Sequence, residues 1–444
     1  MTALQQARLD RHWSQARAIA ELQRHARAVG VALPSHSSLK TELSRWENGH
    51  RKPDTLYCRL FQLAYGRTAE QLGLGQVQDD TALGVSADWQ ECVVNAARLW
   101  SEDMNRRDFL KSAAFVAGGY AGPSLHALVS SDLPRPQREI GERTIGAAEI
   151  SVIQNMTRNL SLVDNQHGGG QVRRTALAFL EGEVSPLLST GAFPETTGRD
   201  LFKCTAELAR LVGWMTHDVG RHGLAQRYLI HALGLAEAAN DSALMSEMLA
   251  AMSQQATYMG EALEAVDLAR GARSLAARAG VSALVAEASV MEAHGHARAG
   301  NSKACAAALT AAEVALDQAD RSADPHWIGY FDEAYLSAKF GHCFRELGDH
   351  ANAIRFAERS LKMDTRYVRG RVFNLTLLAH SHSQAGNLDQ ACAVGRDAGN
   401  AGAELRSHRA VKHLRDFRQT LTPLNGSMQL VALDDALAPV LRAA

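Results

Sequence analysis

The chain of 444 residues lacks the features of membrane and secreted proteins. It contains no run of about 18 apolar residues, so no membrane-spanning helix is predicted. Its first residues do not follow the pattern of a secretory signal peptide. The six cysteines form no CxxC pair, and five of them occur within apolar helical patterns. We therefore expect free, buried thiols in a reducing compartment, which indicates a cytoplasmic protein.

Sequence signatures of common enzyme classes are also missing. The chain has no GxSxG, P-loop, GxGxxG or HExxH motif. Three consecutive glycines at 168–170 are not followed by the Lys and Ser/Thr of a P-loop, so they predict a loop rather than a phosphate cradle. The histidine pairs His294/His296 and His380/His382 are two residues apart, a spacing that points side chains away from each other on a helix. We expect no enzymatic activity, no cofactor and no metal site.

Proline and aromatic residues are scarce, and charge is distributed unevenly. Ten prolines and 6% aromatic residues, in a chain whose second half is rich in alanine, favour an all-α fold. Residues 1–75 carry 11 Lys/Arg and 6 Asp/Glu, a net charge of +5, whereas the remainder is acidic at −6. A small basic module on an acidic body is typical of a module that contacts phosphate, although ordinary surface variation also produces such a difference.

Residues 1–75 predict a compact helical domain. Ser14, Ser38 and Asp54 are the expected N-caps of its second, third and fourth helices, and a short fifth helix is expected after Thr68. The connection between the second and third helices runs from Gly30 to Ser37. A turn of about 3–4 residues is usual in helix-turn-helix motifs, so this connection is unusually long.

Residues 76–145 predict a linker with one amphipathic helix from about residue 87 to 100. Within it, residues 105–119 resemble a twin-arginine export signal, which normally acts at an N-terminus. An exported protein that begins at Met104 is therefore an alternative, but it would discard the basic module. The simpler interpretation is an amphipathic linker helix.

Residues 146–444 predict a solenoid of helical hairpins. Five glycines separate pairs of helical stretches at intervals of 40, 40, 48 and 38 residues, and a small residue follows each glycine five positions later. The glycines are Gly220, Gly260, Gly300, Gly348 and Gly386, and the small residues are Ala225, Ala265, Cys305, Ala353 and Ala391. A glycine lets the chain turn between antiparallel helices, and a small residue lets those helices approach. Repetition of such units indicates an α-solenoid.

Three segments of the N-terminal domain, in the correct order, resemble Cro/repressor-type (XRE-family) helix-turn-helix domains. Residues 4–15 resemble the first helix and the entry to the second helix of that family. Residues 43–53, with the string Ser-Arg-Trp-Glu-Asn-Gly, resemble the end of its third helix and the following turn. Residues 60–73 resemble its closing helices. This resemblance implies a DNA-binding domain whose third helix enters the major groove.

The residues expected to contact DNA follow from this resemblance and from helical spacing. Gln15 matches a glutamine that contacts DNA in the family. On a helix over 38–48, Leu39, Leu43 and Trp46 face inward, and the polar residues between them face outward, where they can reach base edges. The alternative is that these are ordinary solvated residues. The complete set of expected DNA contacts is Gln15, Lys40, Thr41, Ser44, Arg45, Arg51 and Lys52.

The hairpins of residues 146–444 resemble degenerate tetratricopeptide repeats, whose usual period of about 34 residues is shorter than the spacings found here. A DNA-binding domain followed by such repeats is similar to bacterial regulators that sense peptides or other small effectors. We therefore expect double-stranded DNA, a second copy of the chain and a peptide or small-molecule effector as partners. A scaffold that binds proteins and not DNA is the alternative. The expected effector groove consists of Trp214, Asp218, Tyr258, Trp327, Tyr330 and Asp332, residues for which core packing is the competing interpretation.

Overall fold

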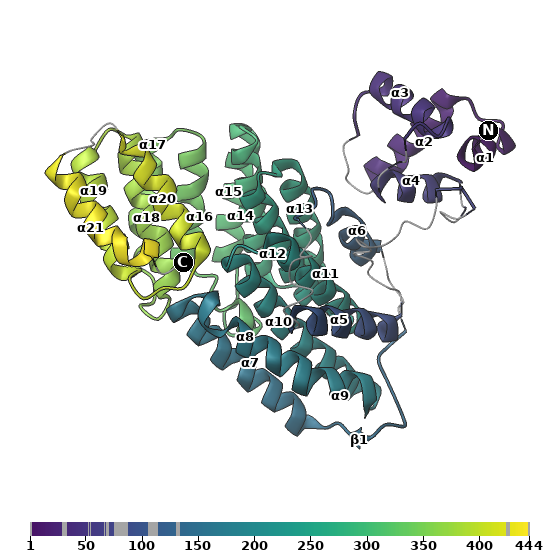
Figure 1. The fold of residues 1–444 in the computed structure, drawn as a ribbon, viewed down its shortest axis with the longest axis horizontal. Coiled ribbons are helices and arrows are strands. Elements are labelled where there is room, and N and C mark those ends of the chain that lie inside the picture. Colours follow the sequence, from purple (N-terminus) through teal and green to yellow (C-terminus); the bar gives the residue numbers. More distant parts are fainter. Residues whose placement is uncertain are drawn as a thin grey trace. The chain divides into compact units, whose positions relative to one another are not determined.

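The computed structural model describes residues 2–28, 33–51, 53, 55–65, 67, 71–74, 88–104, 114–129, 134–422 and 427–442. The protein is all-α, as expected, with one pair of two-residue strands in the described residues (Figure 1). It divides into two compact units, Met1–Gly84 with Gly118–Val129 and Val85–Ala117 with Ser130–Ala444. No helix in the described ranges is both long and apolar enough to cross a bilayer.

The first unit is a small helical bundle. Its helices are α1 (Ala3–Asp10), α2 (Gln15–Ala28), α3 (His36–Glu47), α4 (Thr55–Tyr65) and α6 (Ala121–Val129). The buried core includes Leu4, Ile19, Leu39 and Phe61, which come from four different helices. The inward positions at 39, 43 and 46 predicted from helical spacing are all buried, which confirms the orientation of α3.

The N-caps predicted for this unit are confirmed only in part. Ser14 caps α2, because its hydroxyl accepts a hydrogen bond from the Arg17 amide at 3.1 Å. The prediction that Ser38 caps the third helix is wrong. The helix begins earlier because the Ser35 hydroxyl accepts from the Ser38 amide at 3.4 Å and so satisfies its first turn. Asp54 and residues 68–70 lie outside the described residues, and residues 71–73 form a turn.

The second unit starts with α5 (Trp89–Met104), in the region expected to be a linker. This helix packs against α9 (Ser185–Thr190) and α11 (His222–Ala238). Near its end, the buried carboxylate of Asp103 pairs with Arg173 and accepts a hydrogen bond from the Tyr228 hydroxyl at 2.7 Å. These contacts fix α5 on the helices that follow it in the second unit, which we call the repeat domain.

The helices that precede the hairpins are α7 (Ala147–His167) and α8 (Gly169–Phe179), with a short π-helical segment, Leu180–Val184, leading into α9. Strands β1 (Arg143–Thr144) and β2 (Gly191–Ala192) pair in parallel, with Arg143 opposite Gly191. The interpretation of residues 168–170 as a loop is wrong for two of the three glycines. Only Gly168 lies between helices, and the other two begin α8.

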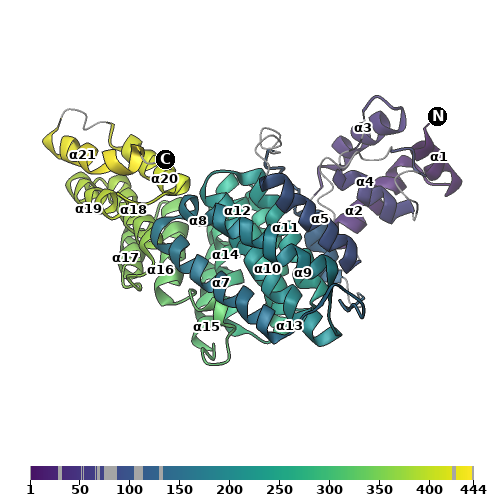
Figure 2. The same cartoon turned by 60° about the horizontal axis from the view of Figure 1, so that its bottom comes forward.

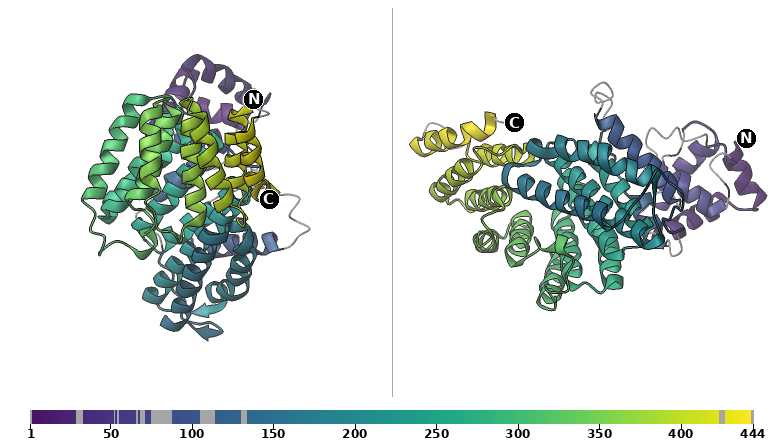
Figure 3. Two further views of the ribbon diagram at one scale, coloured as in Figure 1. Left: turned by 90° about the vertical axis from the view of Figure 1, so that its left-hand side faces the viewer. Right: turned by 90° about the horizontal axis from the view of Figure 1, so that it is seen from below.

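Six helical hairpins follow and form the solenoid, with their helices side by side (Figures 1 and 3). The hairpins are α10 (Glu195–Asp218) with α11, α12 (Ser242–Met259) with α13 (Ala262–Ala279), α14 (Ser282–Arg298) with α15 (Ser302–Asp317), α16 (Glu333–Glu346) with α17 (His350–Ser360), α18 (Val368–Gln384) with α19 (Leu388–Ala401), and α20 (His408–Thr420) with α21 (Met428–Arg442). The short 3₁₀ turn His326–Ile328 lies between α15 and α16. The five glycines predicted to separate helices all have φ between 72° and 92°, and the five small residues are all buried. Both predictions are therefore confirmed.

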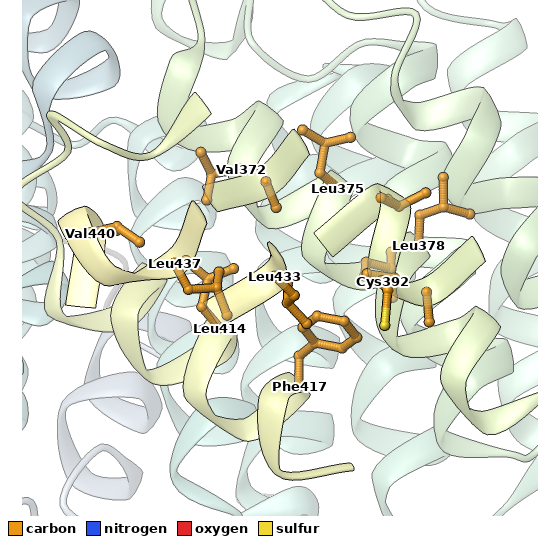
Figure 4. Close-up of a cluster of buried hydrophobic side chains, with 14 of the residues drawn as sticks. Val372, Leu375, Leu378, Cys392, Leu414, Phe417, Leu433, Leu437 and Val440 are labelled. Atoms are coloured by element: carbon orange, nitrogen blue, oxygen red, sulfur yellow. The ribbon is translucent and has the colours of Figure 1, made fainter. Parts of the chain in front are cut away.

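The last two hairpins share an apolar core. Phe417 of α20 lies among side chains of α19 and α21 and meets Leu433, while Leu437 lies beside Leu414 (Figure 4). Gly395 of α19 allows this packing, because a Cβ there would lie 2.6 Å from the Phe417 ring. This core holds α20 against the rest of the C-terminal hairpins.

The C-terminal helices of the solenoid pack against its N-terminal helices, an arrangement that we call the closure. Helix α7 contacts α18, and α10 contacts α20 (Figure 2). The Arg406 amide donates to the His167 carbonyl at 2.8 Å, and the Gly170 amide donates to the Arg406 carbonyl at 3.0 Å. A Cβ on Gly168 would lie 2.6 Å from the Arg406 carbonyl oxygen. Gly168 and Gly170 therefore let the segment before α20 approach the start of α8, and Gly169 allows the close approach of Met215 in α10.

Because the closure is so tight at Gly168, we expect a single added methyl group there to destabilise the second unit. Replacement of Gly168, whose φ is 86°, with Ala should lower the free energy of unfolding of the second unit by about 2–4 kcal/mol, from left-handed strain and the backbone clash together. Gly260→Ala is the control, because φ there is 92° and nothing lies within 4 Å of an added Cβ. Its cost should be about 1–2 kcal/mol, from left-handed strain alone. Urea unfolding followed by circular dichroism measures both, and equal costs would contradict the closure.

Candidate functional site

A buried ion pair positions α3 in the first unit. The Arg8 guanidinium contacts Glu47 through two bonds, Nε–Oε1 at 2.5 Å and Nη2–Oε2 at 3.0 Å. The Gln15 side-chain amide donates to the same carboxylate at 2.9 Å, and the Thr2 hydroxyl donates to the Glu47 carbonyl at 2.7 Å. Paired bonds of this kind fix direction as well as distance. The carboxylate at the end of α3 thus joins α1, α2 and α3.

The outward face of α3 carries most of the residues predicted to contact DNA. Lys40, Thr41 and Arg45 are exposed, and Ser44 is half-buried. Arg51, just past the helix, is also exposed. Lys52 lies outside the described residues. Gln15 is half-buried, and its amide is engaged with Glu47.

One acidic residue on this face was not singled out from the sequence. Glu42 receives Arg45 Nη1 on one carboxylate oxygen at 2.8 Å and Arg51 Nη1 on the other at 3.3 Å. All three side chains retain solvent exposure, and pairs of this kind contribute at most about 1 kcal/mol. The arginines are therefore oriented by Glu42 but can exchange this partner for another at little cost. The i,i+3 spacing of Glu42 and Arg45 was the available sequence signal.

A second candidate site lies in the repeat domain, where first helices of different hairpins face one another. At its edge, four buried charges connect the start and end of the solenoid. Arg369 of α18 binds Asp164 of α7 with two bonds of 2.8 and 2.7 Å and lies 3.4 Å from Asp218 of α10. Arg409 of α20 approaches Asp218 at 3.7 Å. We call these four residues the closure network.

Asp218 is fixed by further bonds and is fully buried. It accepts from the Ser407 hydroxyl at 2.8 Å and from the Gly169 amide at 3.0 Å. From the sequence, Asp218 was expected to line the effector groove, whereas in the structure its carboxylate holds the closure. Burial raises the pKa of the neighbouring Asp164 carboxyl, although Arg369 opposes the shift.

Aromatic rings surround the Arg409 guanidinium. Its central carbon lies 4.9 Å from the ring centres of Trp214 and Phe373 and 5.9 Å from that of Tyr258. Its Nε is buried without a hydrogen-bond partner, as is the Tyr258 hydroxyl. Trp214 and Tyr258, two of the predicted effector residues, therefore meet at Arg409. An unmet buried donor costs about 1–3 kcal/mol, so this arrangement is one that an added acceptor would stabilise.

Uncharged histidines of the hairpin helices add further polar atoms to this interior. His217 Nδ1 lies 2.9 Å from His222 Nδ1, so one ring donates and the other accepts, while His217 Nε2 has no partner. Burial lowers the pKa of His294 and His413 to about 3 and that of His222 to about 4. The pKa values of His217, His342 and His380 are also lowered, mainly by burial. These rings are neutral near pH 7.

Farther along the interior, two glutamates meet one tyrosine. The Tyr330 hydroxyl contacts Glu287 Oε1 at 2.5 Å and Glu247 Oε1 at 3.1 Å. Arg210 of α10 pairs with Glu247 at 2.9 Å. Burial, together with Glu247, raises the pKa of the Glu287 carboxyl well above its ordinary value. Tyr330 is the third predicted effector residue that faces this interior.

Lys339 of α16 is a buried cation that the sequence reasoning missed. Its ammonium lies over the Tyr335 ring, 5.3 Å from the ring centre, and it makes no ion pair or hydrogen bond within the described residues. The pKa of the Lys339 ammonium is lowered to about 8. Burial is the main cause and the charge of Arg409 adds to it, whereas Glu287 opposes the shift. It was detectable as a charged residue on the inward stripe of a predicted helix, between Tyr335 and Cys343.

The remaining predicted effector residues lie elsewhere. Trp327, in the 3₁₀ turn, is half-buried and packs against the apolar core of α14 and α15. Asp332 caps α16 by accepting from the Tyr335 amide at 2.8 Å. Both side chains are thus engaged in local structure.

The described residues contain no group of three or more His, Cys, Asp or Glu side chains suited to a metal ion. A search with models of protein families found no match for the chain, and a search of curated proteins found none either. The geometry of α3 and of the interior is therefore the basis for any function assigned to this chain.

From the closure network we expect loss of the Asp218 carboxylate to destabilise the second unit strongly. Asp218→Asn should lower the free energy of unfolding of the second unit by about 3–5 kcal/mol, because two buried guanidinium groups would then share one carboxylate. Asp416→Asn, which breaks the exposed pair with Lys412, should cost at most about 1 kcal/mol. Similar urea midpoints for both variants would contradict the assigned role of Asp218.

The buried histidines predict a pH-dependent stability. Their folded pKa values lie below the 6.5 of the free side chain, so between pH 6.5 and about 4 the unfolded chain binds protons that the folded chain does not. Stability should be full above pH 6.5 and should fall as the pH drops toward 4. Urea midpoints measured across this range test the sign, and a His413→Leu variant should show a shallower fall. A flat profile would contradict the prediction.

Proposed function

We propose that the protein is a DNA-binding transcriptional regulator. Its first unit would be a helix-turn-helix domain of the XRE type, with α3 in the major groove. The observation that carries this proposal is the exposed polar face of α3, with Lys40, Thr41 and Arg45, on a helix held by the buried pair of Arg8 and Glu47. Lysine and arginine reach guanine edges in the major groove, and hydroxyls reach several bases.

The charge of the domain supports the same proposal. Residues 1–75 carry +5, and Arg51 lies just past α3, where phosphate contacts orient a recognition helix. Glu42 gives the face one carboxylate, which would accept from a cytosine amino group. Binding as a homodimer to half-sites about one helical turn, 34–36 Å, apart is the arrangement such domains use.

In this proposal the repeat domain contributes dimer contacts and senses an effector. The interior where Trp214, Tyr258 and Tyr330 meet buried charges is the proposed effector site. Binding there would shift the population of DNA-competent dimers, which requires different affinities for the two states. The protein would act in the cytoplasm and would not be an enzyme.

A helical-repeat scaffold without sequence-specific DNA binding is the second candidate. The observation that favours it is Glu42, which pairs with both exposed arginines and reduces the positive charge of the α3 face. A protein partner with mixed charge would suit such a face. Salt dependence separates the two, because phosphate contacts make affinity fall steeply as salt increases.

The test of DNA recognition measures binding of the full-length protein to fragments of its own locus, in increasing salt. A variant with Lys40→Ala and Arg45→Ala should lose about 2–4 kcal/mol of binding free energy on the preferred fragment and should show a shallower salt dependence. Circular dichroism should remain unchanged, because both side chains are exposed.

The matched control replaces Lys303 and Arg278, exposed residues of the repeat domain, with alanine and should bind like the wild type. Binding of the wild type no tighter than to random DNA, and equal in both variants, would reject readout by α3. The scaffold proposal would then be favoured.

A further inference from the structure

A small cavity lies between α15, α16 and α17, and none of the predicted effector residues lines it. Its volume is about 80 Å³. A single water needs only about 10–15 Å³, whereas an apolar cavity of about 150 Å³ holds a benzene molecule. By this comparison, the cavity has room for an alkyl group of about four carbons.

The inner wall of the cavity is apolar. It consists of Leu336 and Phe340 of α16 and Phe356 of α17, which are all buried, and of Leu316 of α15, which is half-buried. Such a wall favours an apolar group of matching size, because the group leaves water when it enters.

One buried hydroxyl on this wall has no partner. Ser337 of α16 lines the cavity and is 4% exposed, and its hydroxyl makes no hydrogen bond within the described residues. The buried hydroxyl of Ser381, in contrast, donates to the carbonyl four residues earlier at 2.9 Å. The Ser337 hydroxyl is therefore available to a molecule that occupies the cavity.

Three carboxylates surround the mouth of the cavity. Glu313 and Asp317 of α15 and Glu333 of α16 line it and are exposed. Glu313 and Asp317 are four residues apart on one face of α15, a spacing at which like charges repel. Neither makes an ion pair or a hydrogen bond within the described residues. A cation placed between them would relieve this repulsion.

The cation that lines the cavity already has a partner. Arg359 of α17 pairs with Glu333 at 2.7 Å and lies over the Phe356 ring, 5.3 Å from its centre. Arg355 lies over the same ring at 4.8 Å but does not line the cavity. Three carboxylates and one guanidinium give the lining a net charge of −2. This charge favours a cationic ligand over an anionic one.

We propose that this cavity is a binding site for a small primary alkylammonium, separate from the proposed effector site. The alkyl group packs on the apolar wall. The ammonium forms charge-assisted bonds with Glu313 and Asp317, and its third hydrogen is donated to the Ser337 hydroxyl. A free alkylamine and the N-terminal leucine of a peptide both present these groups, so either is a source of the ligand.

The test measures binding to the full-length protein, without DNA, by saturation-transfer NMR titrations. The probes are 3-methylbutan-1-amine, the uncharged 3-methylbutan-1-ol of nearly the same shape, and the tripeptide Leu-Gly-Gly with a free or an acetylated N-terminus. We expect one or both ammonium probes to bind at least about threefold more tightly than the matched neutral probe. The ammonium probe that binds identifies the source of the ligand.

Substitutions of the carboxylates assign binding to the cavity. The variant with Glu313→Gln and Asp317→Asn should bind the ammonium probe about threefold to tenfold more weakly, because two exposed charge pairs are lost. The matched control, Glu183→Gln with Asp397→Asn, removes the same charge at exposed residues that do not line the cavity. It should bind like the wild type.

A further variant fills the cavity. Ser337→Leu should abolish binding of the ammonium probe and should retain the melting temperature, because the hydroxyl that it removes makes no hydrogen bond. If this variant does not fold, the carboxylate variant decides, since both of its substitutions are at exposed residues.

Three results would overturn the proposal. They are no binding of either ammonium probe, equal affinities for the amine and the alcohol, and wild-type affinity in the carboxylate variant or in folded Ser337→Leu. Since no DNA is present and the cavity lies outside the proposed effector site, none of them affects the proposed DNA binding by α3.

Discussion

The architecture of the repeat domain depends on burying four charges between helices that are distant in sequence. Asp164 and Asp218 come from α7 and α10, and Arg369 and Arg409 come from α18 and α20. A buried charge without its partner costs several kcal/mol, so each pair of helices is stable in this position only when the other is present. Glycine at 168 removes the steric obstacle to that approach.

The closure also explains why the interior is polar. The inward faces of the first helices carry histidines, tyrosines, glutamates and cations, and a solenoid without closure would leave them hydrated. Once enclosed, the histidines stay neutral because charging them in a low-dielectric region is unfavourable.

The first unit uses the same physics on a smaller scale. Glu47 is buried at the end of α3 and engages Arg8 and Gln15, so its charge is compensated and three helices are fixed around it. The residues on the opposite face remain free to meet another molecule. Glu42 holds Arg45 and Arg51 by pairs weak enough to exchange. Helix α3 is thus held rigidly on its buried side and carries exchangeable ion pairs on its exposed side. Such a helix is suited to binding another molecule through its exposed side.

The sequence by itself determined the helical class, the turn glycines and the buried small residues of the hairpins, because these follow from local propensity and period. It also predicted which side chains of α3 face outward. It could not predict the closure network, since contacts such as Asp164 with Arg369 join residues 205 positions apart and leave no local pattern. For the same reason it assigned Asp218 to a groove and missed Lys339 and Arg409. Only the tertiary structure decided which polar side chains met a partner and which stayed unpaired, because that depends on which helices the closure brings together.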